Sequence, residues 1–257
     1  MAKDNPKKTD FEKEFVKEFE GLSRVHTGYK VWDDFITMAS CSLSNVFDKR
    51  FENKREEMYR KCASHYTKDE LEVFAKLLFY VVEALSDNQE QDFLGTLYMR
   101  LKLSNGHLGQ TFTPYHISEL MATVCLAEKL TEEKKDKPIV VSDNCCGGGV
   151  MLIAAANVAR KSGKVNPQKD MVFYAQDIDS TAALMCYIQL SLLGLKAVVK
   201  IGNALSEPMT EGDIEKECVW ITPMLAGEAF FDMHRGCEDL SIFLDNIVDA
   251  DKETDAA

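Results

Sequence analysis

The sequence predicts an α/β fold in which a helical region precedes a domain built on a parallel β-sheet. Across residues 1–105, apolar side chains recur at helical spacing and no alternating strand pattern appears. After residue 107, short β-branched runs alternate with helical segments, which is typical of strand–helix–strand units. These two observations place the helical region at residues 1–105, the α/β domain at 106–236 and an acidic tail at 237–257.

The composition is that of a globular protein and excludes several other classes. Of the 257 residues, 46% are hydrophobic and 28% are charged, which is enough apolar material for a core. No apolar run approaches the ~18 residues of a membrane span. The charged N-terminal stretch also lacks the apolar segment of a secretory signal. We therefore expect no membrane contact and a cytoplasmic location.

The charge is acidic and unevenly distributed. The net charge is −12, and residues 238–257 contribute −6 of it through seven acidic side chains and one lysine. An acidic chain is poorly suited to nonspecific binding of nucleic acid as its main activity, because phosphate contacts require Lys and Arg. A basic run is expected to form a solvated helix face, although a local basic surface is an alternative. This run consists of Lys49, Arg50, Lys54, Arg55, Arg60 and Lys61.

The cysteine spacing favours free thiols. None of the eight cysteines forms a C-x-x-C pair, so the sequence predicts no zinc site or other metal site. Most of them have apolar neighbours, and we expect them to be small buried side chains in the reduced state.

Four helices are predicted in the first region. Phe11, Phe15, Phe19 and Leu22 mark the first, and residues 31–47 form the second. Thr67 and Glu70 form a capping-box pattern that opens a third helix, and residues 93–101 form a fourth.

The second region alternates helices and strands. A loop at residues 107–115 leads into a helix at 116–130. Strands are then predicted at 139–142, 172–175, 197–201 and 218–221, with helices at 151–160 and 180–193 between the first three. Asn166 and Pro167 are predicted to form a turn in one connection.

The turn after the first strand carries the strongest functional signal. Asp143 ends the strand, and the turn that follows contains Gly147 and Gly149 before a helix begins. Glycines at such a place let a ligand approach the backbone, and the helix start offers free N–H groups. The P-loop pattern is absent, and Leu152 stands where a dinucleotide site needs its third glycine. The remaining ligand class is a nucleoside without pyrophosphate, such as S-adenosyl-L-methionine (SAM), with Asp143 receiving its ammonium group. A turn without any ligand is the alternative.

Two further polar residues follow the next strands. Asp177 ends the second strand, where a carboxylate accepts hydrogen bonds from ribose hydroxyls. Asp179 is expected to cap the following helix. Asn203 follows the third strand and is expected either beside an adenine ring or as a simple turn residue.

Residues 90–225 resemble the methylation subunit of type I restriction-modification systems, a family of adenine-N6 DNA methyltransferases. The resemblance is carried by the segments GQTFTP (109–114), DNCCGGG (143–149) and AQDID (175–179), followed by a Gly-Asn-x-Leu turn at 202–205. It implies a Rossmann-like SAM-dependent methyltransferase sheet, with SAM as cofactor and DNA as substrate. We also expect a protein partner or a second copy of the chain. The cofactor-binding positions that it implies are Thr113, Pro114, Asp143, Cys146, Gly147, Gly149, Asp177 and Asn203.

The sequence departs from the family at the catalytic loop. Family members carry Asn/Asp-Pro-Pro-aromatic after the fourth strand, where the loop holds a flipped adenine. Here Thr222 and Pro223 stand at that place, without the amine acceptor or the aromatic ring. The family's sheet also has more strands than the four expected here. We expect another part of the chain, or a partner, to cover the apolar fourth strand, because a bare edge invites aggregation.

Three hypotheses remain open on the sequence. The first is a compact adenine-N6 DNA methyltransferase with a degenerate loop. The second is an inactive SAM-binding or DNA-mimicking protein that engages a restriction-modification complex or another partner complex. The third is a structural relative that has lost the cofactor, and the retained Asp143, Gly147, Gly149 and Asp177 argue against it.

Overall fold

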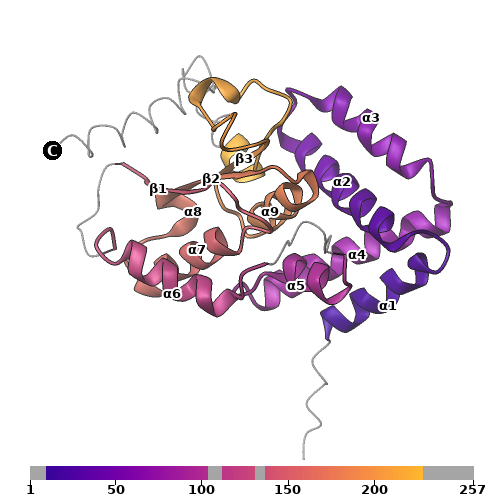
Figure 1. Ribbon diagram of the computed structural model, residues 1–257, viewed down its shortest axis with the longest axis horizontal. Helices are drawn as coiled ribbons and strands as arrows, with labels where there is room; N and C mark the ends of the chain where they lie inside the picture. The colour runs from indigo at the N-terminus through magenta and orange to yellow at the C-terminus, as the bar shows by residue number, and fades with distance from the viewer. Residues whose placement is uncertain (1–9, 104–111, 131–136, 228–257) are drawn as a thin grey trace, which may run out of the picture.

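The computed structural model describes residues 10–103, 112–130 and 137–227. The acidic tail at 237–257 and part of the 107–115 loop lie outside these ranges. Figure 1 shows five N-terminal helices beside a small sheet that the remaining helices cover. The five helices are α1 (Phe11–Ser23), α2 (Gly28–Phe47), α3 (Glu52–Ala63), α4 (Lys68–Asp87) and α5 (Phe93–Arg100).

The sheet has four strands in the order β1-β2-β3-β4. Its strands are β1 (Ile139–Asp143), β2 (Met171–Asp177), β3 (Ala197–Ile201) and β4 (Val219–Ile221). The first three are parallel, as predicted, and the helices of this region are α6 (Tyr115–Leu126), α7 (Val150–Ser162), α8 (Pro167–Asp170) and α9 (Ser180–Leu192). The predicted turn at Asn166 is the start of α8: Asn166 caps this helix and Pro167 is its first residue.

The fourth strand runs against the other three, which corrects the expectation of an all-parallel sheet. Val198 lies opposite Ile221 and Lys200 opposite Val219, so β4 pairs antiparallel with β3. The chain between them, residues 202–218, contains only the short helical turn Glu211–Asp213. A parallel return needs a crossover of about a dozen residues, usually a helix, whereas an antiparallel return needs only a loop.

The two faces of the sheet have separate cores. Phe173, Val199 and Trp220 point to the face covered by helices and belong to the main core, which also includes the N-terminal helices. Val172 and Val198 point to the other face, where Leu225 and other apolar side chains from the connections cover them. The helical region and the helix-covered face of the sheet therefore share one continuous core.

Local signals explain how the N-terminal helices form. The Thr67 and Glu70 capping box at the start of α4 is confirmed, with Thr67 Oγ1 accepting from Glu70 N at 3.3 Å. Phe15, Trp32 and Phe35 are buried and their rings meet edge to face at 5.6–6.2 Å. Such aromatic pairs add to the free energy of burial. This cluster holds α1 against α2, and α2 in turn packs along α9.

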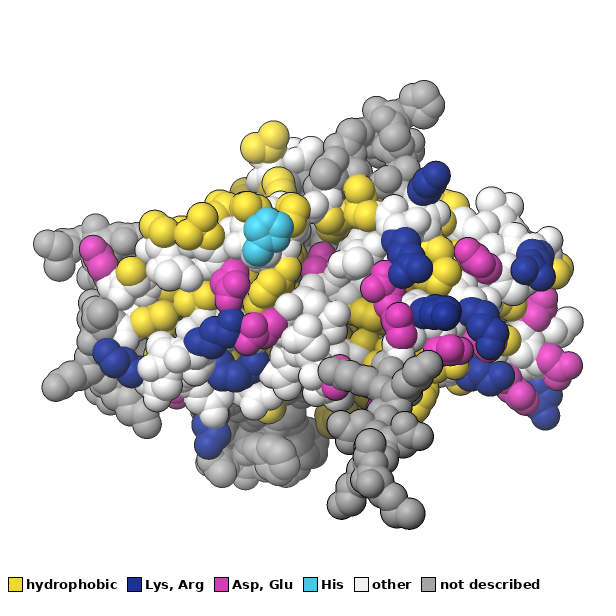
Figure 2. Space-filling model, turned by 90° about the horizontal axis from the view of Figure 1, so that it is seen from below, with side chains coloured by type: hydrophobic (Ala, Val, Ile, Leu, Met, Phe, Trp, Pro, Cys, Tyr) yellow, Lys and Arg dark blue, Asp and Glu magenta, His cyan; other side chains and the backbone are white. Residues whose placement is uncertain are grey.

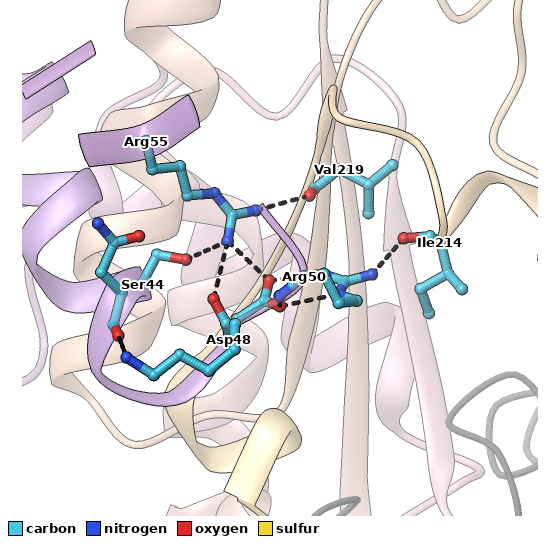
Figure 3. A network of polar contacts seen from close by, with 8 residues as sticks. Ser44, Asp48, Arg50, Arg55, Ile214 and Val219 are labelled. Atoms are coloured by element: carbon cyan, nitrogen blue, oxygen red, sulfur yellow. Dashed lines mark hydrogen bonds and ion pairs between the residues drawn. The ribbon is translucent and has the colours of Figure 1, made fainter. Parts of the chain in front are cut away.

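A buried arginine joins the N-terminal helices to the β4 edge (Figure 3). Arg55 Nη1 donates to Asp48 Oδ2 at 2.8 Å and to Ser44 Oγ at 2.6 Å, while Nη2 donates to Val219 O at 3.2 Å. Its guanidinium also lies 4.4 Å from the centre of the Trp220 ring. All three residues of β4 are buried, so the expectation that another part of the chain covers this strand is confirmed.

The same network corrects the expectation of a solvated basic face at residues 49–61 for two of its six members, Arg50 and Arg55. Arg55 is 2% exposed, and Arg50 donates to Asp48 and to the carbonyl of Ile214 beside β4. Burial alone raises the pKa of the Asp48 carboxyl, but its hydrogen bonds to the two arginines hold the pKa below its usual range. The other four members of the run lie in solvent, as expected: Lys49, Lys54, Arg60 and Lys61.

Three further observations concern the described residues alone. No described helix is long and apolar enough to cross a membrane. The seven cysteines in the described ranges are free thiols. The same ranges contain no group of three or more His, Cys, Asp or Glu side chains arranged to hold a metal ion.

Replacing Arg55 by Met should lower the free energy of unfolding by about 2–4 kcal/mol, because the buried Asp48 carboxylate would lose one of its two arginine partners and the Val219 carbonyl would lose its donor from Arg55. Urea denaturation measures this loss. The matched control is Arg60→Met, whose ion pair with Glu56 is exposed and should contribute no more than about 0.5 kcal/mol. Equal losses in the two variants would show that the buried contacts of Arg55 with Asp48 and Val219 do not stabilise the fold.

Candidate functional site

Acidic and amide side chains meet at the carboxyl edge of the parallel strands. Asp143 pairs in register with Ala175, and Asp177 pairs with Ile201, so β1, β2 and β3 end close together. Asn203 follows β3 by two residues. Ligands of open α/β sheets bind outside the carboxyl ends of their strands. The structure therefore brings Asp143, Asp177 and Asn203 to one edge, as the sequence predicts.

The glycine turn between β1 and α7 is held to this edge by hydrogen bonds from its backbone. Gly147 N donates to Asp177 Oδ2 at 2.8 Å, and Cys146 N donates to Gln176 O at 3.0 Å. The second oxygen of Asp177 accepts from Asp179 N at 2.9 Å. Asp177 therefore fixes both the turn and the start of α9.

Two glycines of the turn are required by its geometry. Gly147 has φ +52° and Gly149 has φ +90°, a region that side chains with a Cβ rarely adopt. A Cβ on Gly149 would lie 2.7 Å from Cys186 Sγ, because α9 passes directly beneath the turn. Gly149 is also the N-cap of α7, the residue directly before the helix. The turn thus needs glycine both for its conformation and for its close contact with α9.

The carboxyl of Asp143 lies in an electrostatically unfavourable place. Burial raises the pKa of Asp143, and the neighbouring Asp177 raises it further, while a hydrogen bond from Cys145 N at 3.1 Å opposes them. A cationic ligand group beside these two carboxylates would stabilise their charged forms. It would thereby offset both the burial of Asp143 and its repulsion by Asp177. Free N–H groups at a helix start suit a ligand carboxylate. The edge can therefore accept a zwitterion such as an amino-acid group.

The aromatic-Thr-Pro segment reaches the turn through its aromatic residue. A Cβ on Gly147 would lie 3.0 Å from the Phe112 ring, and one on Gly148 would lie 3.4 Å from it. Phe112 also packs edge to face on Tyr98 at 5.5 Å. Thr113 and Pro114 are exposed, and the Pro114 carbonyl starts α6. Phe112 therefore touches the turn directly, while its two predicted neighbours lie outside it.

A buried network that the sequence analysis missed supports the turn from behind. Gln189 Nε2 donates to Asp92 Oδ1 and to Gly148 O, both at 2.8 Å. Asp92 also accepts from Gly95 N at 2.8 Å, and burial raises the pKa of its carboxyl. The one available signal was an Asp placed before a helix, which predicts a cap but not a contact with α9.

The N-terminal region reaches the same edge from a second direction. Thr181 Oγ1, at the start of α9, donates to Asp33 Oδ1 of α2 at 2.7 Å. Asp179 caps α9 as predicted, accepting from Thr181 N and Ala182 N. Tyr29 of α2 is close enough to Asp179 for that carboxylate, together with burial, to raise its pKa. One wall of the site thus comes from the helical region.

Two predicted positions have local structural roles. Asn203 Oδ1 accepts from Leu205 N at 2.9 Å, so its side chain closes the turn after β3, which is the alternative that the sequence left open. Cys146 is 3% exposed, and its thiol lies against Cys186 beneath the turn. The hydrogen bond with Cys186 and burial raise the pKa of the Cys146 thiol, so it stays protonated. Its backbone N–H, not its thiol, shapes the edge.

The structure does not bring Thr222 and Pro223 to this edge. Thr222 is fully buried: its Oγ1 accepts from Ala197 N at 2.8 Å and donates to Leu195 O at 2.7 Å. Those partners lie at the start of β3, whereas Asp143 and Asp177 lie at strand ends. The expectation of a catalytic loop at Thr222 and Pro223 is therefore not met, because β4 is antiparallel and delivers them to the opposite end of the sheet.

Comparisons with known proteins agree with this part of the fold. A family model described as N-6 DNA Methylase matches residues 89–236, more than half of the chain. The match begins just before α5 and so includes Asp92 as well as the glycine turn. No curated protein and no solved structure matches the chain.

Replacing Gly149 by Ala should cost about 2–5 kcal/mol of unfolding free energy, from the left-handed backbone and from the clash with Cys186. The control is Gly163→Ala: Gly163 has φ +70° but no atom within 4 Å of the added Cβ. That variant should lose only about 1–2 kcal/mol. Urea denaturation compares them, and equal losses would show that contact with α9 does not constrain the turn.

Proposed function

The chain belongs to the N-6 DNA methylase family, and from this premise we propose that it binds SAM at the carboxyl edge of β1–β3 and acts in adenine-N6 DNA methylation. Bound SAM supplies an activated methyl group on its sulfonium. The proposed relatives within the family are the methylation subunits of type I restriction-modification systems, which the segments 109–114, 143–149 and 175–179 resemble.

One observation carries the proposal: two partly buried carboxylates flank a glycine turn that opens a helix. Asp143 would accept hydrogen bonds from the ligand's ammonium group, and a charged pair of this kind is stronger than a neutral one. The amides at the start of α7 suit the ligand's carboxylate. Asp177 would share its oxygens with the ribose hydroxyls. The remaining proposed contacts are Thr113, Pro114, Cys146, Gly147, Gly149 and Asn203, of which Cys146 would contribute its backbone.

A SAM-binding protein without transfer activity of its own is the second candidate. The burial of Thr222 at the opposite end of the sheet favours it, because an adenine amine needs acceptors beside the methyl donor. Such a protein would engage a restriction-modification complex or another partner complex, either through the ligand-bound edge or as a DNA mimic.

Calorimetric titration with SAM tests the binding proposal. Asp143→Asn should weaken binding about 10- to 100-fold, since it removes the charge from the hydrogen bond to the ammonium group. The control Asp170→Asn alters the same residue type at the opposite end of β2, where Asp170 accepts from Asn166 N, and should bind as the wild type does.

The pH dependence gives a second readout of the same contact. Because the pKa of Asp143 is raised, its carboxylate takes up a proton at higher pH than an exposed Asp does. A cation binds the deprotonated form, so affinity should fall as the pH is lowered from about 7 toward that raised pKa. Asp143→Asn should lose this dependence. The assignment is wrong if the wild-type protein does not bind SAM. It is also wrong if Asp143→Asn binds SAM with the affinity and the pH dependence of the wild type.

Transfer of a labelled methyl group from SAM to adenine-containing duplex DNA separates the two candidates. Label in N6-methyladenine that depends on Asp143 supports the methyltransferase. SAM binding without any transfer, measured in the same preparation, supports the second candidate. The family alone implies transfer, whereas the position of Thr222 predicts a rate far below that of a complete catalytic loop.

A further inference from the structure

The two edge strands of the sheet differ in how far other parts of the chain cover them. The β4 edge is sealed by Arg55, Arg50 and Lys54, which reach Val219, Ile214 and Glu217. At the other edge, β1 pairs with β2 alone among the described residues. Its residues are partly exposed, whereas those of β4 are all buried. An open strand edge is a template for pairing with another strand.

A stripe of exposed apolar side chains runs along α6. Ile117, Leu120, Met121 and Val124 are 41%, 62%, 47% and 69% exposed. Their spacing of i, i+3, i+4 and i+7 places them on one face, and Cys125, also exposed, follows them. Figure 2 shows hydrophobic side chains gathered on the half of the molecule that contains α6 in Figure 1. Buried Ser118, Ala122 and Leu126 face inward toward α7, so the stripe has no partner in the described chain.

The open strand and the apolar stripe lie at the same end of the molecule. Figure 1 places β1 and α6 together at the end away from α3, with α7 packed against both. A partner that covers both features must therefore present an unpaired strand next to an apolar helix face. A second copy related by a two-fold axis offers this pair: β1 would meet β1 antiparallel, and α6 would meet α6.

Charge also favours a second copy. Apart from His116, Glu119 is the one acidic or basic residue on α6, and Lys161 pairs with it at 2.6 Å, so the excess negative charge of the protein is not concentrated here. Two copies of this face can therefore approach each other without strong charge repulsion.

We propose that the free edge of β1 and the apolar stripe of α6 form the interface of a two-fold symmetric homodimer. In this dimer the two sheets join through β1, and the Ile117, Leu120, Met121 and Val124 side chains of both copies bury one another. The ligand-binding carboxyl ends remain at opposite edges of the joined sheet.

Sedimentation velocity of the full-length protein tests this proposal without reference to SAM. The 29.0-kDa chain should sediment as a dimer at about 10 µM. Leu120→Glu combined with Val124→Glu should weaken dimerisation at least about 100-fold, since four acidic side chains would meet in an apolar seam. Both positions are more than half exposed, so the variant should keep its circular dichroism spectrum.

The matched control is Phe79→Glu, on α4 away from this surface, where the side chain is 53% exposed. It should leave the dimer unchanged. Hydrogen exchange should protect the β1 amides that point away from β2 in the wild-type dimer and release them in the monomeric double variant, while the β1 amides bonded to β2 stay protected in both. The proposal is wrong if the wild type is monomeric up to about 100 µM, or if the double variant remains dimeric. Protection of the outward β1 amides in a monomer would also overturn it.

Discussion

The arrangement of the site depends on the hydrogen bonds that the side-chain amide of Gln189 makes. It is fully buried, and it bonds to Asp92 before α5, to Leu94 N within α5 and to Gly148 in the glycine turn. A buried amide that loses a partner is left with an unsatisfied polar group, which costs about 1–3 kcal/mol. The turn, α5 and α9 therefore hold one another in place. This is why the N-terminal helices and the α/β domain form one structural unit.

The elements that could be predicted from the sequence are those with local signals. The Thr67 and Glu70 capping box and the β-branched runs of β1 to β3 are each specified by residues close together in the chain. The glycine turn is also local, and its two acidic neighbours follow from the rule that parallel strands end together. For this reason the position of Asp143 and Asp177 at one edge of the sheet could be predicted from short segments of the sequence.

The features that could not be predicted depend on distant contacts. Nothing near Arg55 in the sequence shows that it turns inward to Val219, which lies 164 residues away. Asp92 and Gln189 are likewise 97 residues apart. The direction of β4 did have a signal, because the chain between Ile201 and Val219 holds no helix to serve as a parallel crossover. The missing helix therefore indicates that Thr222 and Pro223 lie away from the strand ends that hold Asp143 and Asp177.

The hydrogen bonds that Asp177 makes within the chain have a thermodynamic consequence. Both of its oxygens already hold backbone amides, from Gly147 and from Asp179, and Phe112 packs on the outer side of the turn. The turn is therefore ordered by folding, and a ligand has little conformational entropy to remove from it. A molecule bound at the proposed site would be selected by its fit to a fixed backbone, and a variant that loosens the turn would lose discrimination between ligands along with affinity.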